Sequence, residues 1–271
     1  MRYAVVGHTE WVEFARVPEM PHAGDIVHAT DTWQEPAGGG AVIARQVARL
    51  AGSCVFFTAV GDDEIGHATA ERLTELGVTL EIQDAGRPSR RAWTHVDAAG
   101  ERAITLLSEK LLPRGPLPLD DFDAVYFVAG DVAALRSARE ARFVAATTRE
   151  QPTLREAAVP LDLLVGSLND KGERLEGGVE ARTVVLTDGA RGGLANGERY
   201  SAVEPPGPIA DAYGAGDSFS AALFFSLARG DTLAGALDLA AHAGASVITG
   251  WGPYSAQLTL AEWRPASPGS R

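Results

Sequence analysis

Short apolar runs that alternate with amphipathic stretches of helix length restrict the possible folds of this chain most strongly. Runs typical of buried strands occur at Tyr3–Gly7, Cys54–Val60, Ala124–Ala129, Leu161–Val165 and Thr183–Thr187. Helices are predicted between and after them, at Ala41–Leu50, Glu64–Leu76, Val132–Thr148, Ser218–Leu227 and Leu233–Thr249. Strands that alternate with helices of this size favour an α/β fold with a doubly wound, mostly parallel sheet and helices on both faces.

Two segments do not fit this alternation. Ile26–Trp33 and Ser89–Leu107 are rich in Thr, Val, Trp and Arg. Within the second segment, Arg91–Val96 and Glu101–Leu107 flank a turn at residues 97–100, which predicts a β-hairpin. A small sheet made from both segments would cover the main sheet as a lid. The alternative is an extension at the edge of the main sheet.

The length of 271 residues suits one large α/β domain, although two small domains would also fit. Hydrophobic residues make up 45% and charged residues 22%, which are ordinary globular values. No internal repeat is evident. We therefore predict a single domain over residues 1–264, with a Pro-, Ser- and Gly-rich tail at 265–271 that is expected to be disordered.

The charge balance argues against several classes of partner. Asp and Glu number 36 against 24 Lys and Arg, a formal net charge of −12, which disfavours binding to nucleic acid or to an anionic membrane surface. No apolar run is long enough for a secretion signal or a membrane span, so the expected location is the cytoplasm. Cys54 is the only cysteine, which excludes an internal disulfide and a CxxC pair.

The segment Asp211–Ala222 is the most informative for chemistry. Its small residues permit a tight turn, and apolar residues that follow begin a helix. If Gly214–Asp217 form the first turn, their free N–H groups favour an anion at one point. The carboxylate of Asp217 beside such an anion site suits a general base. The alternative is that Asp217 is a helix N-cap and that the glycines serve packing.

Other nucleotide-binding and metal-binding motifs are missing. Phe219 stands where the third glycine of a dinucleotide fingerprint belongs, and Ile43 does so after Gly38–Gly40, which disfavours a Rossmann dehydrogenase. Neither lysine, Lys110 nor Lys171, follows a glycine, which excludes a Walker-type phosphate loop. The six histidines have no metal-ligand spacing.

Four glycine-containing motifs follow one another along nearly the whole chain: Gly38–Ala41, Val60–Gly66, Leu186–Gly193 and Asp211–Asp217. Their order and content resemble the ribokinase-like (PfkB) carbohydrate and nucleoside kinases. The resemblance implies a doubly wound α/β domain with a small β lid over the sugar. It also implies ATP-dependent transfer of the γ-phosphoryl group to a hydroxyl of a sugar, polyol or nucleoside, assisted by Mg²⁺.

Residue roles follow from the matched motif positions. The resemblance implies that Asp217 deprotonates the substrate hydroxyl and that the amides of Gly214, Ala215 and Gly216 stabilise the transferring phosphoryl group. The residues that it places at the nucleotide are Ser167, Thr187, Asp188, Gly189, Gly192 and, near the adenine, His242. The alternatives are a strand-end role for Thr187 and a helix histidine with satisfied hydrogen bonds for His242.

The substrate and ion sites are also assigned by position. Gly39 and Gly40 would lie at the sugar, where Glu10 could accept hydroxyl hydrogen bonds and Trp11 could stack on a ring. The alternative for Trp11 is a core position facing the lid. Asp170 would help to organise Mg²⁺ through water, and Asp211 would either bind a monovalent cation such as K⁺ or cap a turn.

Several positions depart from the family pattern. Ser167–Asp170 reads S-x-x-D where the family has N-x-x-E, and Ile43 replaces an Asn that usually helps to bind sugar. With Glu10 and Trp11 in the first loop, these changes put typical ribose or fructose recognition in doubt. A non-catalytic sugar or nucleotide sensor is the alternative function, and a homodimer through the lid stays open.

Two charged groups have alternative interpretations. Asp62-Asp63-Glu64 suggests a metal site, but a turn that caps the following helix is favoured. Arg90 and Arg91 would meet a phosphate or carboxylate on the substrate, or they are solvated strand ends.

Overall fold

The computed structural model describes residues 1–263, so the predicted tail at 265–271 lies outside the described residues. Its main sheet has the strand order β13-β12-β11-β10-β9-β8-β1-β4-β5. All neighbours from β11 to β5 are parallel, and only β12 and β13 run antiparallel. The strands are β1 (Tyr3–Val6), β4 (Val55–Val60), β5 (Thr79–Asp84), β8 (Ala124–Phe127), β9 (Phe143–Thr147), β10 (Leu161–Ser167), β11 (Ala181–Thr187), β12 (Gly193–Ala195) and β13 (Glu198–Tyr200).

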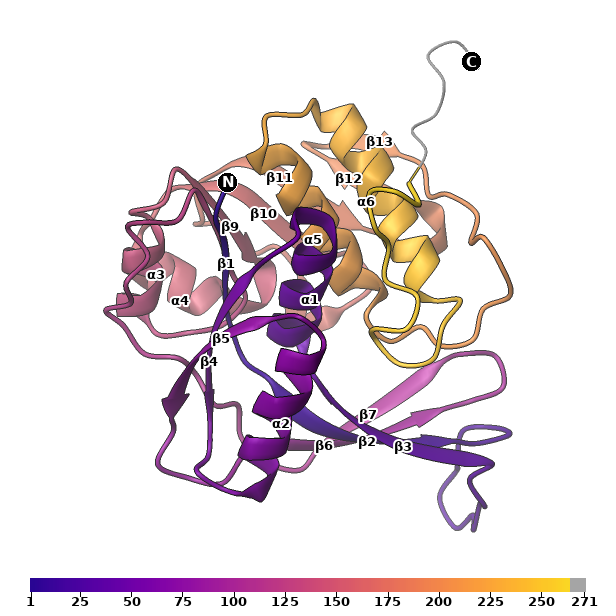
Figure 1. Cartoon of the computed structure of the whole chain (residues 1–271). Helices are drawn as coiled ribbons and strands as arrows, with labels where there is room; N and C mark the ends of the chain where they lie inside the picture. Colours follow the sequence, from indigo (N-terminus) through magenta and orange to yellow (C-terminus); the bar gives the residue numbers. More distant parts are fainter. Residues whose placement is uncertain (264–271) are drawn as a thin grey trace.

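Helices cover both faces of this sheet, which confirms the predicted fold class (Figure 1). One face carries α1 (Gly39–Ala51), α5 (Ala215–Ala228) and α6 (Leu233–Val247), and the other carries α3 (Val132–Ala138) and α4 (Gln151–Ala157). Neighbouring residues of β1 enter different cores: Val5 packs with α1 and α5, and Val6 packs with α3. A strand buried on both faces must be apolar throughout, which explains the continuous runs in the sequence.

A separate four-stranded sheet with the order β3-β2-β6-β7 forms the lid, seen at the lower right of Figure 1. Its strands are β2 (Glu10–Arg16), β3 (Asp31–Ala37), β6 (Arg91–Val96) and β7 (Arg102–Leu106). The predicted hairpin is present, because β6 and β7 pair antiparallel. Of the predicted segment Ile26–Trp33, only the end is strand. Residues 26–30 lie outside the sheet, and Ile26 is 92% exposed, so it has no core to enter.

The predicted helix Val132–Thr148 is wrong in its second half. α3 ends at Ala138, and residues 143–147 form β9 between β8 and β10. The alanines of this stretch favour a helix locally, but Val144, Ala145 and Ala146 are fully buried by their neighbours in the sheet. Tertiary burial therefore outweighs local helix propensity here.

The acidic run at the start of α2 (Glu64–Glu75) is a helix cap. The Asp63 carboxylate accepts hydrogen bonds from the amides of Gly66 at 2.8 Å and Ser89 at 2.7 Å. Farther along α2, Arg72 forms a two-point ion pair with Glu35 of β3, with N···O distances of 2.7 and 2.9 Å. This ion pair therefore connects α2, a helix of the main domain, to the lid strand β3. Within residues 1–263, no helix combines the length and apolar character needed to cross a membrane.

The sheet has a switch point between β1 and β8. From β1 the chain continues outward through β4 and β5, whereas β8 to β11 extend in the opposite direction. Open α/β sheets bind ligands beyond the carboxyl ends of the strands at such a point. Gly7 follows β1 there, and a Cβ built on it would lie 3.0 Å from the Cβ of Val128 and 3.1 Å from the Cα of Gly40. The backbone of α1 therefore begins directly above the switch point.

Replacing Gly40 with Ala tests this close approach. The new Cβ would lie 2.5 Å from the carbonyl oxygen of His8 and 2.9 Å from the Phe56 ring, so we expect Gly40→Ala to lower the free energy of unfolding by about 1–3 kcal/mol. Gly235→Ala in α6 is the control, because its Cβ would make an ordinary 3.4 Å contact with Thr232. Chemical denaturation measures both, and equal losses would contradict the argument.

Candidate active site

The glycine triplet at the start of α1 brings two acidic side chains close to each other. Gly38 has φ of +86°, which favours glycine, and a Cβ there would lie 3.4 Å from the Cγ of Glu10. A Cβ on Gly39 would lie 3.1 Å from Oδ1 of Asp217. Only residues without side chains leave room for both carboxylates. The structure therefore brings together Gly39, Gly40, Glu10 and Asp217, as expected for a substrate site.

The N-terminus of α5 presents free backbone donors. Gly214, in the left-handed region with φ of +83°, is the N-cap residue, so the interpretation of Asp217 as the N-cap is wrong. The amides of Gly214, Gly216 and Asp217 have no protein acceptor among residues 1–263, whereas the amide of Ala215 lies 3.4 Å from the carbonyl of Ala212. A Cβ on Gly216 would meet nothing within 4 Å. This open space beside free amides suits an anion.

Asp217 is half-buried, and its surroundings control its charge. Burial raises the pKa of its carboxyl, Arg102 and Arg149 lower it, and the negative charge of Glu10 raises it, with a net shift upward. A helix N-terminus favours a charged carboxylate, but the upward shift of the pKa shows that burial has the larger effect here. A raised pKa makes the carboxylate a stronger base.

The nucleotide residues predicted from the sequence lie at the carboxyl ends of adjacent strands. Ser167 ends β10 and pairs in register with Thr187, which ends β11. Gly189 and Gly192 follow with φ of +58° and +82°. A Cβ on Gly192 would lie 2.0 Å from the carbonyl oxygen of Tyr200, so this turn requires glycine. The structure thus brings five of the six residues together at the carboxyl ends of β10 and β11, namely Ser167, Thr187, Asp188, Gly189 and Gly192.

Asp188 and His242 have protein partners already. The Asp188 carboxylate accepts two hydrogen bonds from Arg191, at 2.6 and 2.9 Å, and these lower the pKa of Asp188. On α6, Nδ1 of His242 donates to the carbonyl of Asp238 at 2.8 Å, which leaves Nε2 for another partner. Asp188 therefore shapes the turn, and contact of His242 with adenine stays a prediction.

Arg149 and Glu173 are charged residues at the site that sequence reasoning missed. Arg149 follows β9 and ion-pairs with Asp170, and its Nη2 lies 3.1 Å from Oε1 of Glu173. Burial raises the pKa of Glu173, Arg149 lowers it and the charge of Asp217 raises it, with a net upward shift. Two carboxylates thus share one guanidinium near Asp217. The sequence did not indicate these two residues, because the prediction of a helix over Val132–Thr148 hid the strand β9 that positions Arg149.

Asp211 is fully buried in the loop before α5. Its Oδ1 accepts a hydrogen bond from the amide of Tyr213 at 2.8 Å, and Oδ2 accepts one from the amide of Gly252 at 3.0 Å. Burial raises the pKa of this carboxyl. These contacts agree with a turn-capping role, and the monovalent cation stays a prediction.

The structure separates the other predicted substrate residue, Trp11, from Glu10. Successive side chains of a strand point to opposite faces, and Glu10 is buried toward the glycine triplet. Trp11 is half-exposed on the other face, where its Nε1 donates to Gln34 at 3.2 Å. Ile43, at the position of the family's asparagine, is a core residue of α1.

The lid also contacts the loop that precedes α5. The amide of Ala212 donates to the carbonyl of Gly100 at 2.9 Å, and Arg102 donates to the carbonyl of Ala212 at 2.8 Å. The β6–β7 turn therefore holds the loop from which the free amides extend.

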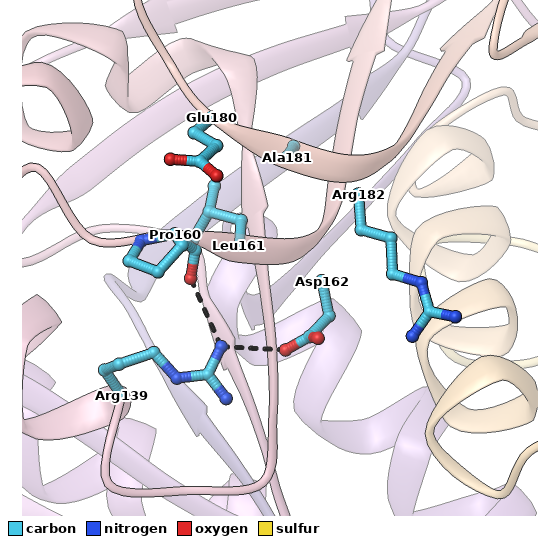
Figure 2. A pocket seen from close by; sticks show the side chains of 7 residues that line it. All are labelled: Arg139, Pro160, Leu161, Asp162, Glu180, Ala181 and Arg182. Atoms are coloured by element: carbon cyan, nitrogen blue, oxygen red, sulfur yellow. Dashed lines mark hydrogen bonds and ion pairs between the residues drawn. The ribbon is translucent and has the colours of Figure 1, made fainter.

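A shallow pocket of about 340 Å³ lies at the amino-terminal ends of β10 and β11, away from these residues (Figure 2). Two arginines, Arg139 and Arg182, line this pocket, and the guanidinium of Arg139 already donates to Asp162 at 2.8 Å and to the carbonyl of Pro160 at 3.2 Å. Because ligands of open α/β sheets bind at the opposite ends of the strands, this pocket is not the substrate site.

Known proteins with similar sequences are carbohydrate kinases. The acarbose 7(IV)-phosphotransferase of Actinoplanes sp. is 45% identical over 75 residues, which are 26% of this chain and 25% of that protein. The ribokinase of Dictyostelium discoideum is 30% identical over 105 residues, which are 38% of this chain and 33% of the relative. The matched stretches thus span a third or less of each of these two relatives.

The fold has solved counterparts across its whole length. The ribokinase from Cryptococcus neoformans var. grubii serotype A, solved in complex with ADP, superposes with a TM-score of 0.77 at 22% identity, covering 96% of this chain and 97% of that one. The pfkB family carbohydrate kinase model matches residues 2–129 and 141–259. The chain therefore belongs to the pfkB family of carbohydrate kinases, as the order of its glycine motifs indicated.

Proposed function

We propose that this protein transfers the γ-phosphoryl group of ATP to a hydroxyl group of a sugar, polyol or nucleoside. The observation that carries the proposal is the position of Asp217 against Gly39, beside free amides at the switch point of the sheet. The ADP bound to the ribokinase and the phosphotransferase activity in the name of the acarbose relative support the choice of nucleotide and acceptor. No observation favours the non-catalytic sensor.

In the proposed reaction, Asp217 accepts the proton of the substrate hydroxyl. The hydroxyl oxygen forms a bond to the γ-phosphorus while the bond from that phosphorus to the β–γ bridging oxygen breaks, and ADP leaves. The amides of Gly214, Gly216 and Asp217 donate hydrogen bonds to the phosphoryl oxygens as charge moves onto them. Positioning and charge stabilisation therefore supply most of the catalysis.

The nucleotide would lie over the turn after β11. Thr187, Gly189 and Gly192 would hold its phosphates and ribose, with Ser167 beside them and His242 near the adenine. Carboxylate oxygens suit Mg²⁺, so Asp170 and Glu173 would hold the hydrated ion. Bound Mg²⁺ neutralises phosphate charge; within residues 1–263 no three potential ligand side chains converge as a metal cage.

The remaining expectations are part of this proposal. A monovalent cation such as K⁺ would use the free lone pairs of Asp211, whose two oxygens each accept one backbone hydrogen bond. A homodimer through the lid would use β7, an edge strand whose five residues are all exposed. The cytoplasm remains the proposed location.

Replacing Asp217 with Asn tests the base. Asn keeps the shape and cannot accept the proton, so kcat should fall by roughly 10²–10⁴. ADP affinity, measured by calorimetry, should stay within a few-fold of wild type. In the wild type, kcat/KM should fall as the pH drops through the raised pKa of Asp217. Parallel loss of ADP affinity and turnover would indicate a structural role.

The same substitution should change stability in a pH-dependent way. The raised pKa of Asp217 means that the folded state holds its proton more tightly than the unfolded state, so ionisation destabilises the fold as the pH rises above the unfolded value. Asp217→Asn should therefore melt at a higher temperature than wild type at pH 7, and the difference should shrink at acid pH.

Asp63→Asn is the matched control, because it should change the melting temperature in the opposite direction. Burial works against its charge, but hydrogen bonds from Ser89 and Gly66 lower the pKa of Asp63 overall, so its ionised form stabilises the fold. This variant should melt at a lower temperature than wild type at pH 7, with the difference shrinking as the pH falls. Shifts of the same sign in both variants would contradict the assignment.

The magnesium site is tested by Asp170→Asn and Glu173→Gln. Each removes one carboxylate that would hold the hydrated ion, so the Mg²⁺ concentration for half-maximal activity should rise by roughly 10- to 100-fold. Glu176→Gln is the control, because Glu176 forms an exposed ion pair with Arg155 in the same segment. If all three variants titrate like wild type, these carboxylates do not serve magnesium.

A further inference from the structure

A buried ion pair lies at the base of the lid. Glu10 of β2 and Arg90, just before β6, precede the paired residues Trp11 and Arg91, so their side chains are neighbours across two parallel strands. Nε of Arg90 lies 2.7 Å from Oε2 of Glu10, and the two residues are only 5% and 6% exposed. Arg90 is thus neither a solvated strand end nor free to move away.

This pair leaves hydrogen-bonding capacity unused. Although the two charges are close, the angle between Nε of Arg90 and Oε2 of Glu10 is unsuitable for a hydrogen bond. Nη1 of Arg90 also has no acceptor among residues 1–263. Nδ1 of the neighbouring His8 is also buried without a partner. Buried polar groups without partners are costly, and native structures rarely keep several at one place. A ligand with hydroxyl groups would satisfy them, because each hydroxyl both donates and accepts.

The pair is placed to contact the same molecule as Asp217. Glu10 lies against Gly38, and Asp217 lies against the next residue, Gly39. Gly38 and Gly39 are adjacent residues, and the charge of Glu10 raises the pKa of Asp217, so the two carboxylates are close enough to interact. An acceptor with its reacting hydroxyl at Asp217 would place other hydroxyl groups at Glu10 and Arg90.

The surrounding charges favour a neutral acceptor. Lys110 already binds Glu150 at 2.7 Å, and Arg149 binds Asp170 and Glu173. Arg90 itself is compensated by Glu10. Each of these three cations is therefore already paired with a carboxylate, and Arg102, the other cation near Asp217, donates to the carbonyl of Ala212. Arg91, the other arginine considered from the sequence, pairs with Glu13 on the opposite face of the lid.

We propose that Glu10 and Arg90 together bind two adjacent hydroxyl groups of the acceptor, Glu10 as acceptor of a hydrogen bond and Arg90 as donor. The substrate is then a neutral sugar, polyol or nucleoside with a vicinal diol, and neither a sugar phosphate nor a sugar acid. This inference rests on the proposed kinase function and adds Arg90 as a specificity-determining residue.

Substrate charge is tested first, on the wild-type protein with Mg-ATP. The neutral probes are D-ribose, D-fructose, myo-inositol and acarbose, and the anionic probes are ribose 5-phosphate and fructose 6-phosphate, with ADP release as the readout. A neutral acceptor should have the highest kcat/KM. A sugar phosphate that exceeds every neutral probe would overturn the inference and leave the kinase function intact.

The pair itself is tested with Arg90→Lys and Glu10→Gln. A hydrogen bond to a charged group contributes enough that KM for the best neutral acceptor should rise roughly 10- to 100-fold, while kcat and KM for ATP stay within a few-fold. Arg91→Lys and Glu13→Gln are matched controls, since they alter an ion pair on the same two strands but on the outer face. Their KM values should equal the wild-type value.

Further measurements separate the possible failures. If Arg90→Lys does not fold, the best acceptor and its analogue lacking one hydroxyl of the diol are compared on wild type, and equal KM values overturn the inference. The inference is also overturned if Arg90→Lys and Glu10→Gln have the same KM as the control variants Arg91→Lys and Glu13→Gln. That result would leave the proposed kinase function intact. If no probe is phosphorylated in an Asp217-dependent reaction, the proposed function fails, and this inference fails with it.

Discussion

The close approach of backbone at the switch point is the constraint on which the site depends. The end of β1, the start of α1 and the start of α5 meet where side chains have no room, so glycines occupy positions 38–40 and 214. The positions of α1 and α5 are fixed by the hydrophobic core between them, which contains many more residues than the site. Asp217 and Glu10 are therefore held by the hydrophobic core and not by each other.

That packing also determines the acidity of the site. Burial is the largest influence on Asp217, Glu10 and Glu173, and it raises the pKa of all three. Each has an arginine that works in the other direction: Arg102 and Arg149 for Asp217, Arg149 for Glu173, and Arg90 for Glu10. Burial makes the Asp217 carboxylate more basic, and the arginines limit how far its ionisation is suppressed. A fully exposed Asp would be ionised but weakly basic.

The sequence could predict those features that depend on a residue's own backbone conformation, and it missed those that depend on contacts between distant segments. Glycine at positions 38, 189, 192 and 214 answers a local need of the backbone, a positive φ, so the glycine motifs could indicate the candidate site from the sequence alone. The ion pair of Arg149 and Glu173 depends on the pairing of β9 with β10. The alanines of β9 favour a helix locally, so the sequence did not predict this strand. Treating β2 as a loop placed Trp11 with Glu10, although the two-residue period of a strand separates their side chains.

The lid contributes to the charge state of Asp217. Its β6–β7 turn is bonded to Ala212, immediately before the helix that carries the free amides. Arg102, the first residue of β7 after this turn, lowers the pKa of Asp217. Burial raises the pKa of Asp217 and Arg102 acts against it, so this lid residue favours the charged form of the carboxyl, which burial disfavours. The contacts of one short turn therefore hold, close to Asp217, a cation that opposes the effect of burial on its charge.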